Sequence, residues 1–228
     1  MPRYIEQLVS EQVRKSELCR RRAAATQQCA SPVITISRRM GTGARVVAEK
    51  LAGDLGWSLW GKDLITAIAE DAEVSRKVVE AFDEKTVSEI ETLSYAALGD
   101  FEMGDFIYQK HLAKAVASIS KLGNAIILGR GAWFLVLTAF HIRIDASDEH
   151  RIANMVRYEG LSRDHAEAKL RESDRERREF LERTYGRDRA HAFEFDLSIR
   201  MDRLGTDGAV EIIKTAIREW CKETPGQG

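Results

Sequence analysis

The segment VITISRRMGTGARVVAEKLA (residues 33–52) joins a β-branched run, a glycine-bearing loop and a helical pattern. The run VITIS carries no charge, which is typical of a strand buried in a parallel sheet. Gly41 and Gly43 follow it, and glycine takes backbone angles that other residues resist. A helix is then predicted from about residue 44 to residue 55, ended by Gly56. The predicted inward face of this helix consists of Val46, Val47, Leu51 and Leu55.

Short apolar runs alternate with helical patterns along the rest of the chain. Further strands are predicted at 125–128, 141–147 and 195–202. Helices are predicted at 4–24, over most of 62–121 with an interruption at LGDFEMGDF (98–106), at 149–185 and at 206–219. Buried strands that alternate with helices indicate an α/β fold with a parallel sheet.

A glycine loop between a strand and a helix is a common phosphate site, because loop N–H groups and the helix N-terminus both favour an anion. The full phosphate-loop pattern is GxxxxGK[ST], and SRRMGTGARV matches it only in part, without the lysine. The loop is therefore a nucleoside triphosphate site, a weaker anion site or a structural turn. The candidate replacement for the positive charge of the missing lysine is Arg45, and Arg38 or Arg39 could approach the same phosphate from the opposite side of the loop. Arginine and lysine are not interchangeable, however.

The run ITISRRMGTGARVVAEKLAGDLGW (34–57) resembles the opening of cytidylate kinases, in particular the divergent cytidylate kinase-like group with its S-R-E-(F/Y)-G-S-G-G-R-E-I-A loop. Other pieces of the chain are similar to the same family and follow in the same order. They are LGRGA (128–132), IRIDASDEHR (142–151), SDRERR (173–178) and DLSIRMDRLGTDGAVEII (196–213). The resemblance extends from about residue 33 to residue 218.

This resemblance implies a P-loop kinase fold, with a parallel sheet flanked by helices, a helical acceptor-binding part at about 60–120 and an arginine-rich lid at about 155–190. Residues 1–30 would be a helical extension of a kinase-like domain at 31–228. ATP would bind at the loop and be closed over by the lid. The residues implied to contact ATP are Ser37, Arg38, Gly41, Thr42, Gly43, Ala44, Arg45, Val46, Arg171 and Arg178.

Two of these positions depart from the family's pattern. Ala44 falls where the lysine of standard cytidylate kinases should stand, and Val46 falls where the Mg²⁺-binding Ser or Thr should stand. Because valine cannot ligate a metal, Mg²⁺ is expected to be held mainly by nucleotide and water, or by another carboxylate.

The resemblance also implies an acceptor site. Arg130 stands between two glycines at a strand end and would hold the acceptor phosphate; an ion pair with a nearby carboxylate is the alternative. Lys62 and Asp63 fall in the acceptor-side stretch, where Gly61 replaces the family's first acid. Trp57, Trp60 and Trp133 either stack on a base or pack in the core.

The segment RESDRERRE (171–179) places Arg171, Arg175 and Arg178 on one helical face. An arginine face of this kind can close over transferring phosphates. The alternative is a helix on the protein surface, in which the arginines form ion pairs with the acidic residues between them. Arg175 and Arg177, oriented by Asp174, best fit the family's D-R-x-R spacing. The implied catalytic residues are Arg45, Arg130, Arg175 and Arg177, and the implied acceptor-binding residues are Lys62, Asp63, Arg130 and Asp174.

Two further residues of the IRIDASDEHR segment have open roles. Asp145 ends a predicted strand and either caps the next turn or binds a metal through water. Arg151 lies near the ATP base or the β-phosphate, or it pairs with Glu149.

Composition limits the remaining function classes. The chain has 35 Lys and Arg against 36 Asp and Glu, so no global basic field favours nucleic acid or an anionic membrane. The three cysteines lack CxxC spacing and the five histidines are scattered, which argues against a metal site and fits a reducing compartment. The most apolar segment, at 132–140, is much shorter than the ~20 residues of a membrane helix, so a cytoplasmic protein is expected.

The N-terminal helix has a narrow apolar stripe of Ile5, Leu8, Val9 and Val13. This stripe docks on the body of the chain or pairs with another copy, which would make a homodimer.

The loop and the arginines favour ATP-dependent phosphoryl transfer, and the resemblance implies a nucleoside monophosphate, CMP or dCMP, as the acceptor. The alternatives are a nucleotide-sensing or partner-binding protein that has lost turnover, and a small-molecule kinase with a non-nucleotide acceptor. Substitution Arg45→Ala is expected to reduce phosphate transfer sharply and to leave the fold intact.

Overall fold

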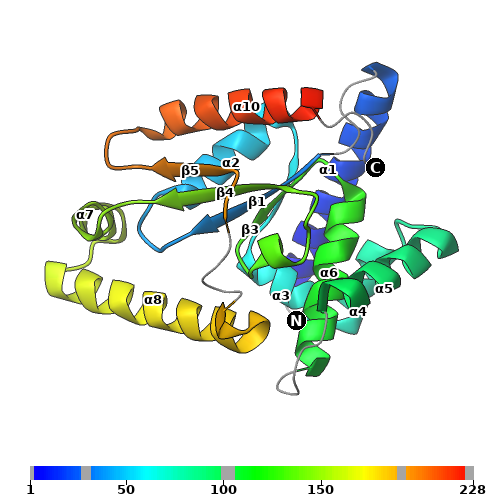
Figure 1. The fold of residues 1–228 in the computed structure, drawn as a ribbon, viewed down its shortest axis with the longest axis horizontal. Coiled ribbons are helices and arrows are strands. Elements are labelled where there is room, and N and C mark those ends of the chain that lie inside the picture. Colours follow the sequence, from blue (N-terminus) through cyan, green and yellow to red (C-terminus); the bar gives the residue numbers. More distant parts are fainter. Residues whose placement is uncertain (1–2, 27–31, 99–105, 189–193, 224–228) are drawn as a thin grey trace.

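The computed structural model describes residues 3–26, 32–98, 106–188 and 194–223. Within these residues, a five-stranded sheet has the strand order β2-β3-β1-β4-β5, and every neighbouring pair is parallel. The strands are β1 (Val33–Arg38), β2 (Ser58–Trp60), β3 (Ala125–Leu128), β4 (Phe140–Asp145) and β5 (Leu197–Arg200). Helices cover both faces of the sheet (Figure 1). The predicted α/β fold with a parallel sheet is confirmed.

The helices follow the predicted pattern with two differences. They are α1 (Arg3–Thr26), α2 (Ala44–Leu55), α3 (Lys62–Glu70), α4 (Ala72–Val79), α5 (Glu84–Leu98), α6 (Phe106–Leu122), the 3-10 turn η1 (Ala132–Phe134), α7 (Asp148–Glu159), α8 (Arg163–Tyr185) and α10 (Thr206–Glu223). The single helix predicted at 149–185 is two helices, because Gly160 has a left-handed φ of 68° and ends α7. Strand β2 was not predicted, since three residues are too few to show a period. Most of LGDFEMGDF lies outside the described residues.

The two faces of the central strands differ in chemistry. Ile34 and Ile36 of β1 point into an apolar core shared with α2 and α10. Thr35 and Ser37 are also buried, and they alternate with the isoleucines. Strand β4 continues this pattern, because its register sets His141 beside Thr35 and Arg143 beside Ser37. One face of the sheet centre is therefore apolar, and the other carries a buried polar row.

Helix α2 begins directly after the glycine loop that follows β1. Its N-cap is Gly43, at a φ of 78°, and its C-cap is Gly56, also left-handed. Val47 and Leu51 are buried in the core that α2 shares with α10. The prediction that Val46 faces inward is wrong, because its side chain is 55% exposed. Only the stripe at spacings of three and four from Ala44 meets the sheet, and position 46 lies off that stripe.

Helix α1 covers the edge of the sheet at β2. Val9 and Val13 are buried in the core formed with α3, α4 and α6. The Oε1 atom of Gln12 accepts a hydrogen bond of 2.8 Å from the N–H of Leu59, and this contact satisfies a donor on the edge strand. The apolar stripe of α1 thus docks on its own chain. Pairing of two copies through this helix stays a prediction and would have to use its other face.

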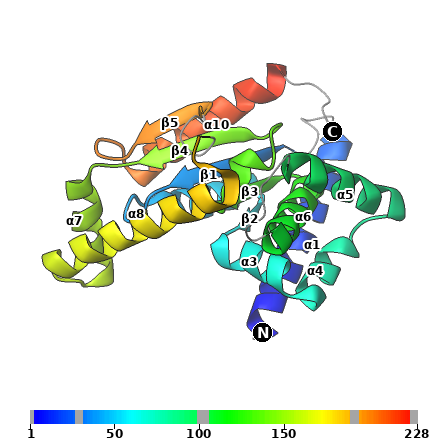
Figure 2. The ribbon, with the colours of Figure 1, turned by 60° about the horizontal axis from the view of Figure 1, so that its bottom comes forward.

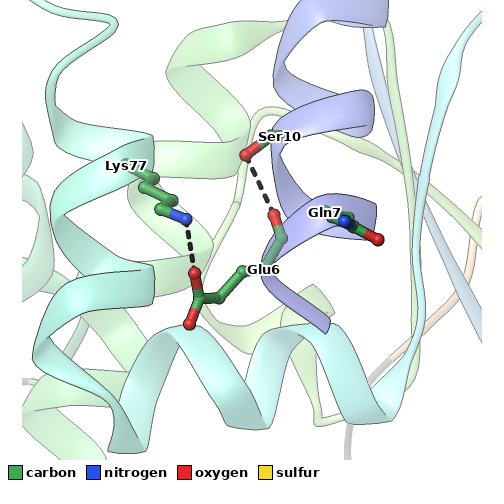
Figure 3. A pocket seen from close by; sticks show the side chains of 4 residues that line it. All are labelled: Glu6, Gln7, Ser10 and Lys77. Carbon is green, nitrogen blue, oxygen red and sulfur yellow. Dashed lines mark hydrogen bonds and ion pairs between the residues drawn. The ribbon is translucent and has the colours of Figure 1, made fainter. Parts of the chain in front are cut away.

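A shallow hollow of about 410 Å³ lies where α1 meets α4 (Figure 3). The Nζ atom of Lys77 bonds the Oε2 atom of Glu6 at 2.6 Å, and the hydroxyl of Ser10 donates to the Glu6 carbonyl at 2.9 Å. Because the charges in this hollow satisfy each other, it serves the docking of α1 and offers no group for chemistry.

Candidate functional site

Three loops meet at the carboxyl edge of the sheet. They follow β1 (residues 39–43), β3 (residues 129–131) and β4 (residues 146–147), and the central strands carry them side by side. Helix α8 lies along the sheet on the side opposite α10 (Figures 1 and 2). In open parallel sheets, ligands bind at this edge, where neighbouring strands send their helices to opposite faces.

The loop after β1 is held by its carbonyl groups. The Nε atom of Arg151 donates to the Met40 carbonyl at 2.7 Å, and the Nδ2 atom of Asn154 donates to the Gly41 carbonyl at 2.8 Å. Gly41 has a φ of 79°, and a Cβ there would lie 2.9 Å from the Arg151 carbonyl oxygen. Within the described part of the chain, the N–H groups of Arg45 and Val46 donate to no protein acceptor. The loop is therefore fixed through its carbonyl groups by residues of α7, and the N–H groups at the start of α2 are left open to an anion.

The positions of the missing lysine and hydroxyl offer no charge or metal ligand. Ala44 is buried, and Val46 is exposed. The side chain of Arg45 is 80% exposed, and its Nε atom bonds the Oε1 atom of Glu49 at 2.9 Å. This hydrogen bond and the charge of Glu49 raise the pKa of Arg45. The loop itself therefore contributes backbone N–H groups and a helix terminus, and its extra positive charge has to come from elsewhere.

Four arginines supply that charge, and we call them the guanidinium cluster. They are Arg38 at the end of β1, Arg130 after β3, Arg143 in β4 and Arg177 in α8. The Oγ atom of Ser37 accepts hydrogen bonds from both Arg143 Nη1, at 3.2 Å, and Arg177 Nη2, at 2.8 Å. The guanidinium of Arg38 packs against Gly129, where a Cβ would collide with it. The cluster thus joins the strand ends to α8.

The cluster is short of negative charge. Burial, together with the charges of Arg143 and Arg38, lowers the pKa of Arg177 to about 10. Burial also lowers the pKa of Arg38, and Arg130 and Arg45 add to this effect. Among the described residues, Arg38 makes no hydrogen bond or ion pair, and Arg130 bonds only the neutral hydroxyl of Thr66, at 2.6 and 3.0 Å. Half-buried cations that repel one another, with Asp145 beside Arg143 as their one ion-pair partner among the described residues, indicate an anion site.

The turn that presents Arg130 is strained. Arg130 has a φ of 53°, which is uncommon for a residue with a side chain, and the φ values of Gly129 and Gly131 are 95° and 64°. The hydroxyl of Tyr185 donates to the Arg130 carbonyl at 2.7 Å, and the Tyr185 ring fills the space that a Cβ on Gly131 would need. The Arg130 guanidinium lies 5.0 Å from the ring centroid of Phe180. A turn held against its preference, with an arginine at its tip, is typical of a binding site.

Two carboxylates near the carboxyl edge of the sheet, Asp145 and Asp174, already form ion pairs with arginines. The Oδ1 atom of Asp145 accepts from Arg39 Nε at 2.7 Å and from the Ala146 N–H at 2.8 Å, which is the capping role predicted as one option. Burial alone would raise the pKa of Asp145, but these hydrogen bonds and the charges of Arg39 and Arg143 lower it. Asp174 binds Arg151 through both carboxylate oxygens. Arg151 therefore pairs with Asp174 and Asp148 and not with Glu149.

These donors do not fit a protein-held Mg²⁺. Val46 replaces a hydroxyl ligand, Asp145 is occupied by two arginines, and the Thr42 hydroxyl donates to the Arg39 carbonyl at 2.9 Å. In the described ranges, no group of three His, Cys, Asp or Glu side chains is placed to hold a metal ion. The ligands that a divalent cation prefers are therefore missing from the protein side of this site.

The structure separates the predicted site residues into two groups. Ser37, Arg38, Arg130 and Arg177 come together at the carboxyl edge, and the loop residues 41–43 lie beside them. The other arginines of the predicted lid point outward: Arg171 is paired with Glu167, Arg175 is paired with Glu172, and Arg178 is exposed. Nucleotide binding by Arg171 and Arg178 and a catalytic role for Arg175 stay predictions.

On the acceptor side, Lys62 and Asp63 begin α3 and are both exposed. The charge of Asp63 acts on Arg38 and Arg45, and in both cases it raises the pKa of the arginine. Trp57 and Trp60 pack in the core. The Trp133 ring lies 5.7 Å from the Arg177 guanidinium and is buried.

The sequence prediction missed Arg143 and Asn154. The signal for Arg143 is present in FHIRID (140–145), where polar residues alternate with apolar ones at the period of a strand. A buried strand with an arginine on one face needs an anion or a polar partner on that face. Asn154 has no comparable signal, because its bond to the Gly41 carbonyl depends on how α7 lies on the loop.

Comparison with known proteins agrees with this architecture. A sequence model of the cytidylate kinase-like family matches residues 33–203. No curated protein matches the chain. An uncharacterized protein from Eubacterium ventriosum is similar in structure, with a TM-score of 0.52, 18% identity, and coverage of 82% of this chain and 98% of that one. A shikimate kinase from Bacteroides thetaiotaomicron has a TM-score of 0.46 and 14% identity, over 82% of this chain and 98% of its own.

Proposed function

The chain belongs to the cytidylate kinase-like family, and we propose that it transfers the γ-phosphoryl group of ATP to a nucleoside monophosphate, CMP or dCMP. The observation that carries this proposal is the guanidinium cluster, which gathers four half-buried cations beside a glycine loop. Phosphoryl transfer leaves little covalent work to the protein, so positioned positive charge supplies most of the catalysis.

The triphosphate fits the loop after β1. The open N–H groups of Arg45 and Val46 and the N-terminus of α2 favour the phosphate oxygens there. Arg151 and Asn154 fix the loop through its carbonyls, so they position these N–H groups without touching nucleotide. The cluster residues Arg38 and Arg177 then face the transferring group.

The acceptor phosphate fits Arg130. This arginine has only a hydroxyl and an aromatic ring as partners, and it stands at a turn between β3 and the helical layer of α3 and α6. A dianionic acceptor relieves the repulsion between Arg130 and Arg38, whereas a neutral acceptor leaves it in place. This charge argument favours a phosphomonoester as the acceptor. Lys62 and Asp63, at the start of α3, are the proposed contacts to the rest of the nucleotide.

In the reaction, an oxygen of the acceptor phosphate attacks the γ-phosphorus, and the bond from that phosphorus to the bridging oxygen of ADP breaks. Arg38 and Arg177 donate hydrogen bonds to the oxygens whose charge grows, and Arg130 orients the attacking group. Ser37 holds Arg143 and Arg177 in one geometry before substrate arrives. Helix α8 excludes water from one side of this site.

A second candidate is a nucleotide-binding protein without turnover. The outward position of Arg45 favours it, because no side chain of the loop reaches toward the nucleotide as lysine does in active relatives of the fold. The cluster favours the enzyme, since a turn strained to present Arg130 is costly to keep in a protein that only senses nucleotide.

The test is a coupled assay of ADP release with CMP, dCMP, UMP, AMP and sugar phosphates as acceptors, run beside nucleotide-dependent thermal shifts. Turnover with CMP or dCMP supports the proposal. Thermal stabilisation by ATP without turnover on any acceptor supports the second candidate, and turnover only with a non-nucleotide acceptor replaces the nucleoside monophosphate.

The proposed place of action is the cytoplasm. Among the described residues, no helix is long and apolar enough to cross a bilayer. The proposed reaction consumes ATP, which the cytoplasm supplies, and the Cys19 thiol donates to the Gly56 carbonyl at 3.1 Å, as a reducing compartment allows.

A further inference from the structure

Sites that transfer phosphoryl groups have to neutralise several phosphate oxygens at once. Known sites use a lysine, one or more arginines and a divalent cation for this purpose. In this chain the lysine position is Ala44, and the described side chains at the carboxyl edge offer no ligand set for a divalent cation. The charge that a metal and a lysine supply elsewhere therefore has to be accounted for by other groups.

The guanidinium cluster has enough charge to do this alone. Arg38 and Arg130 have no carboxylate within ion-pair distance among the described residues. Arg177 bonds a serine hydroxyl, and Arg143 shares the single carboxylate of Asp145 with Arg39. Arg38, Arg130 and Arg177 thus have no ion pair among the described residues, and all three side chains are half-buried beside the loop. A di- or triphosphate brings a comparable negative charge.

We propose that the guanidinium cluster, and no metal ion held by the protein, neutralises the phosphates of the bound nucleotide, so that this protein binds ADP and ATP without Mg²⁺. The inference rests on the nucleotide-binding function proposed above. Arg143 gains a role that neither the sequence nor the family match assigns. It projects from strand β4 and shares the Ser37 hydroxyl with Arg177.

The direct test is isothermal titration calorimetry with ADP and with a non-hydrolysable ATP analogue, in buffer with excess Mg²⁺ and in buffer with EDTA. The dissociation constants in the two buffers are expected to agree within about threefold, because no protein ligand to Mg²⁺ is lost when the metal is removed. A dissociation constant about tenfold or more weaker in EDTA would overturn the proposal. Absence of binding in both buffers contradicts the proposed function as well, so the two failures are distinguishable.

Variants assign the effect to the cluster. Arg143→Gln is expected to weaken ADP binding in EDTA by about tenfold or more, as expected for one lost charge-assisted hydrogen bond, and to leave part of that loss recoverable by Mg²⁺. Arg177→Gln, on a helix instead of a central strand, gives the same readout if Arg143→Gln does not fold. The matched control is Arg218→Gln, an exposed arginine on α10, which should bind as the parent does. If folded Arg143→Gln and Arg177→Gln both bind ADP in EDTA as tightly as the parent, the cluster is not the site.

Discussion

The buried guanidinium of Arg151 binds both carboxylate oxygens of Asp174, at 2.7 and 2.8 Å, and so joins the first turn of α7 to the middle of α8. The same guanidinium donates to the Met40 carbonyl in the loop after β1. One side chain, only 1% exposed, thus fixes the position of α8 relative to the loop after β1. The alignment of Arg177 with the loop depends on this link.

Removal of the Asp174 carboxylate is expected to destabilise the fold. Asp174→Asn should lower the free energy of unfolding by about 2 kcal/mol. This is less than the full cost of leaving a buried charge without a partner, because Asp148 also accepts a hydrogen bond from Arg151. Urea unfolding measures this change. The matched control on the same helix is Glu179→Gln, whose exposed pair with Arg175 should contribute less than about 0.5 kcal/mol. Equal effects of the two substitutions would contradict the structural role of the Arg151–Asp174 pair.

Gly129 is expected to be required for the position of Arg38. Gly129→Ala combines a left-handed φ of 95° with a collision against the Arg38 guanidinium, so it should displace that cation and weaken ADP binding by about tenfold or more. Gly160→Ala also has a left-handed φ, of 68°, but its Cβ would meet nothing within 4 Å. It should lose about 1 kcal/mol of stability and keep its affinity for ADP. Normal ADP affinity in Gly129→Ala would show that the crowded contact is unimportant.

Arg177 and Arg45 are expected to differ in their effect on turnover. The sequence assigns the main replacement for lysine to Arg45, whereas the structure pairs Arg45 with Glu49 in solvent and buries Arg177 beside Ser37. Arg177→Ala should therefore reduce kcat by about a hundredfold or more, and Arg45→Ala by about tenfold or less. Steady-state kinetics with CMP, after circular dichroism has confirmed folding, compares them. A larger loss of kcat in Arg45→Ala than in Arg177→Ala would show that Arg45 is the main replacement for the lysine.

The affinity for ADP is expected to depend on pH through Arg177. Burial lowers its pKa to about 10, so the side chain is charged at pH 7 to 9 and its contribution to phosphate binding is fully present there. This contribution is lost as the pH rises through the pKa. The same shift lowers the stability of the ligand-free protein below pH 10, because the unfolded state binds the proton more tightly, and this penalty lessens at higher pH.

Titrations with ADP at pH 7.5, 9 and 10.5 measure this dependence, with Arg177→Gln as the reference. The difference in binding free energy between parent and variant should be constant up to pH 9 and should shrink at pH 10.5. A difference that stays constant to pH 10.5 would show that Arg177 does not titrate in this range.

The strand, loop and helix at 33–55 were predictable because their signals are local. The β-branched run, the two glycines and the helical period all lie within one short segment. The gathering of Ser37, Arg38 and Arg130 at one edge also followed from the sequence, since parallel strands place their carboxyl ends together.

The direction of individual arginines was not predictable. Every turn of α8 carries arginines and acids, so the pattern does not show that Arg177 faces the sheet while Arg175 faces solvent. Arg45 lies next to Ala44, yet a rotation of about 100° per helical residue turns its side chain away from the sheet. Arg143 was missed because a strand that reads as buried was taken as apolar on both faces.

A crystal structure of the protein with a non-hydrolysable ATP analogue and CMP would show directly which groups contact the phosphates. We expect phosphate oxygens of the analogue within hydrogen-bond distance of the Arg45 N–H and of the Arg38 and Arg177 guanidiniums, with the CMP phosphate at Arg130. Nucleotide bound elsewhere, with the four guanidiniums contacting no phosphate, would contradict this expectation.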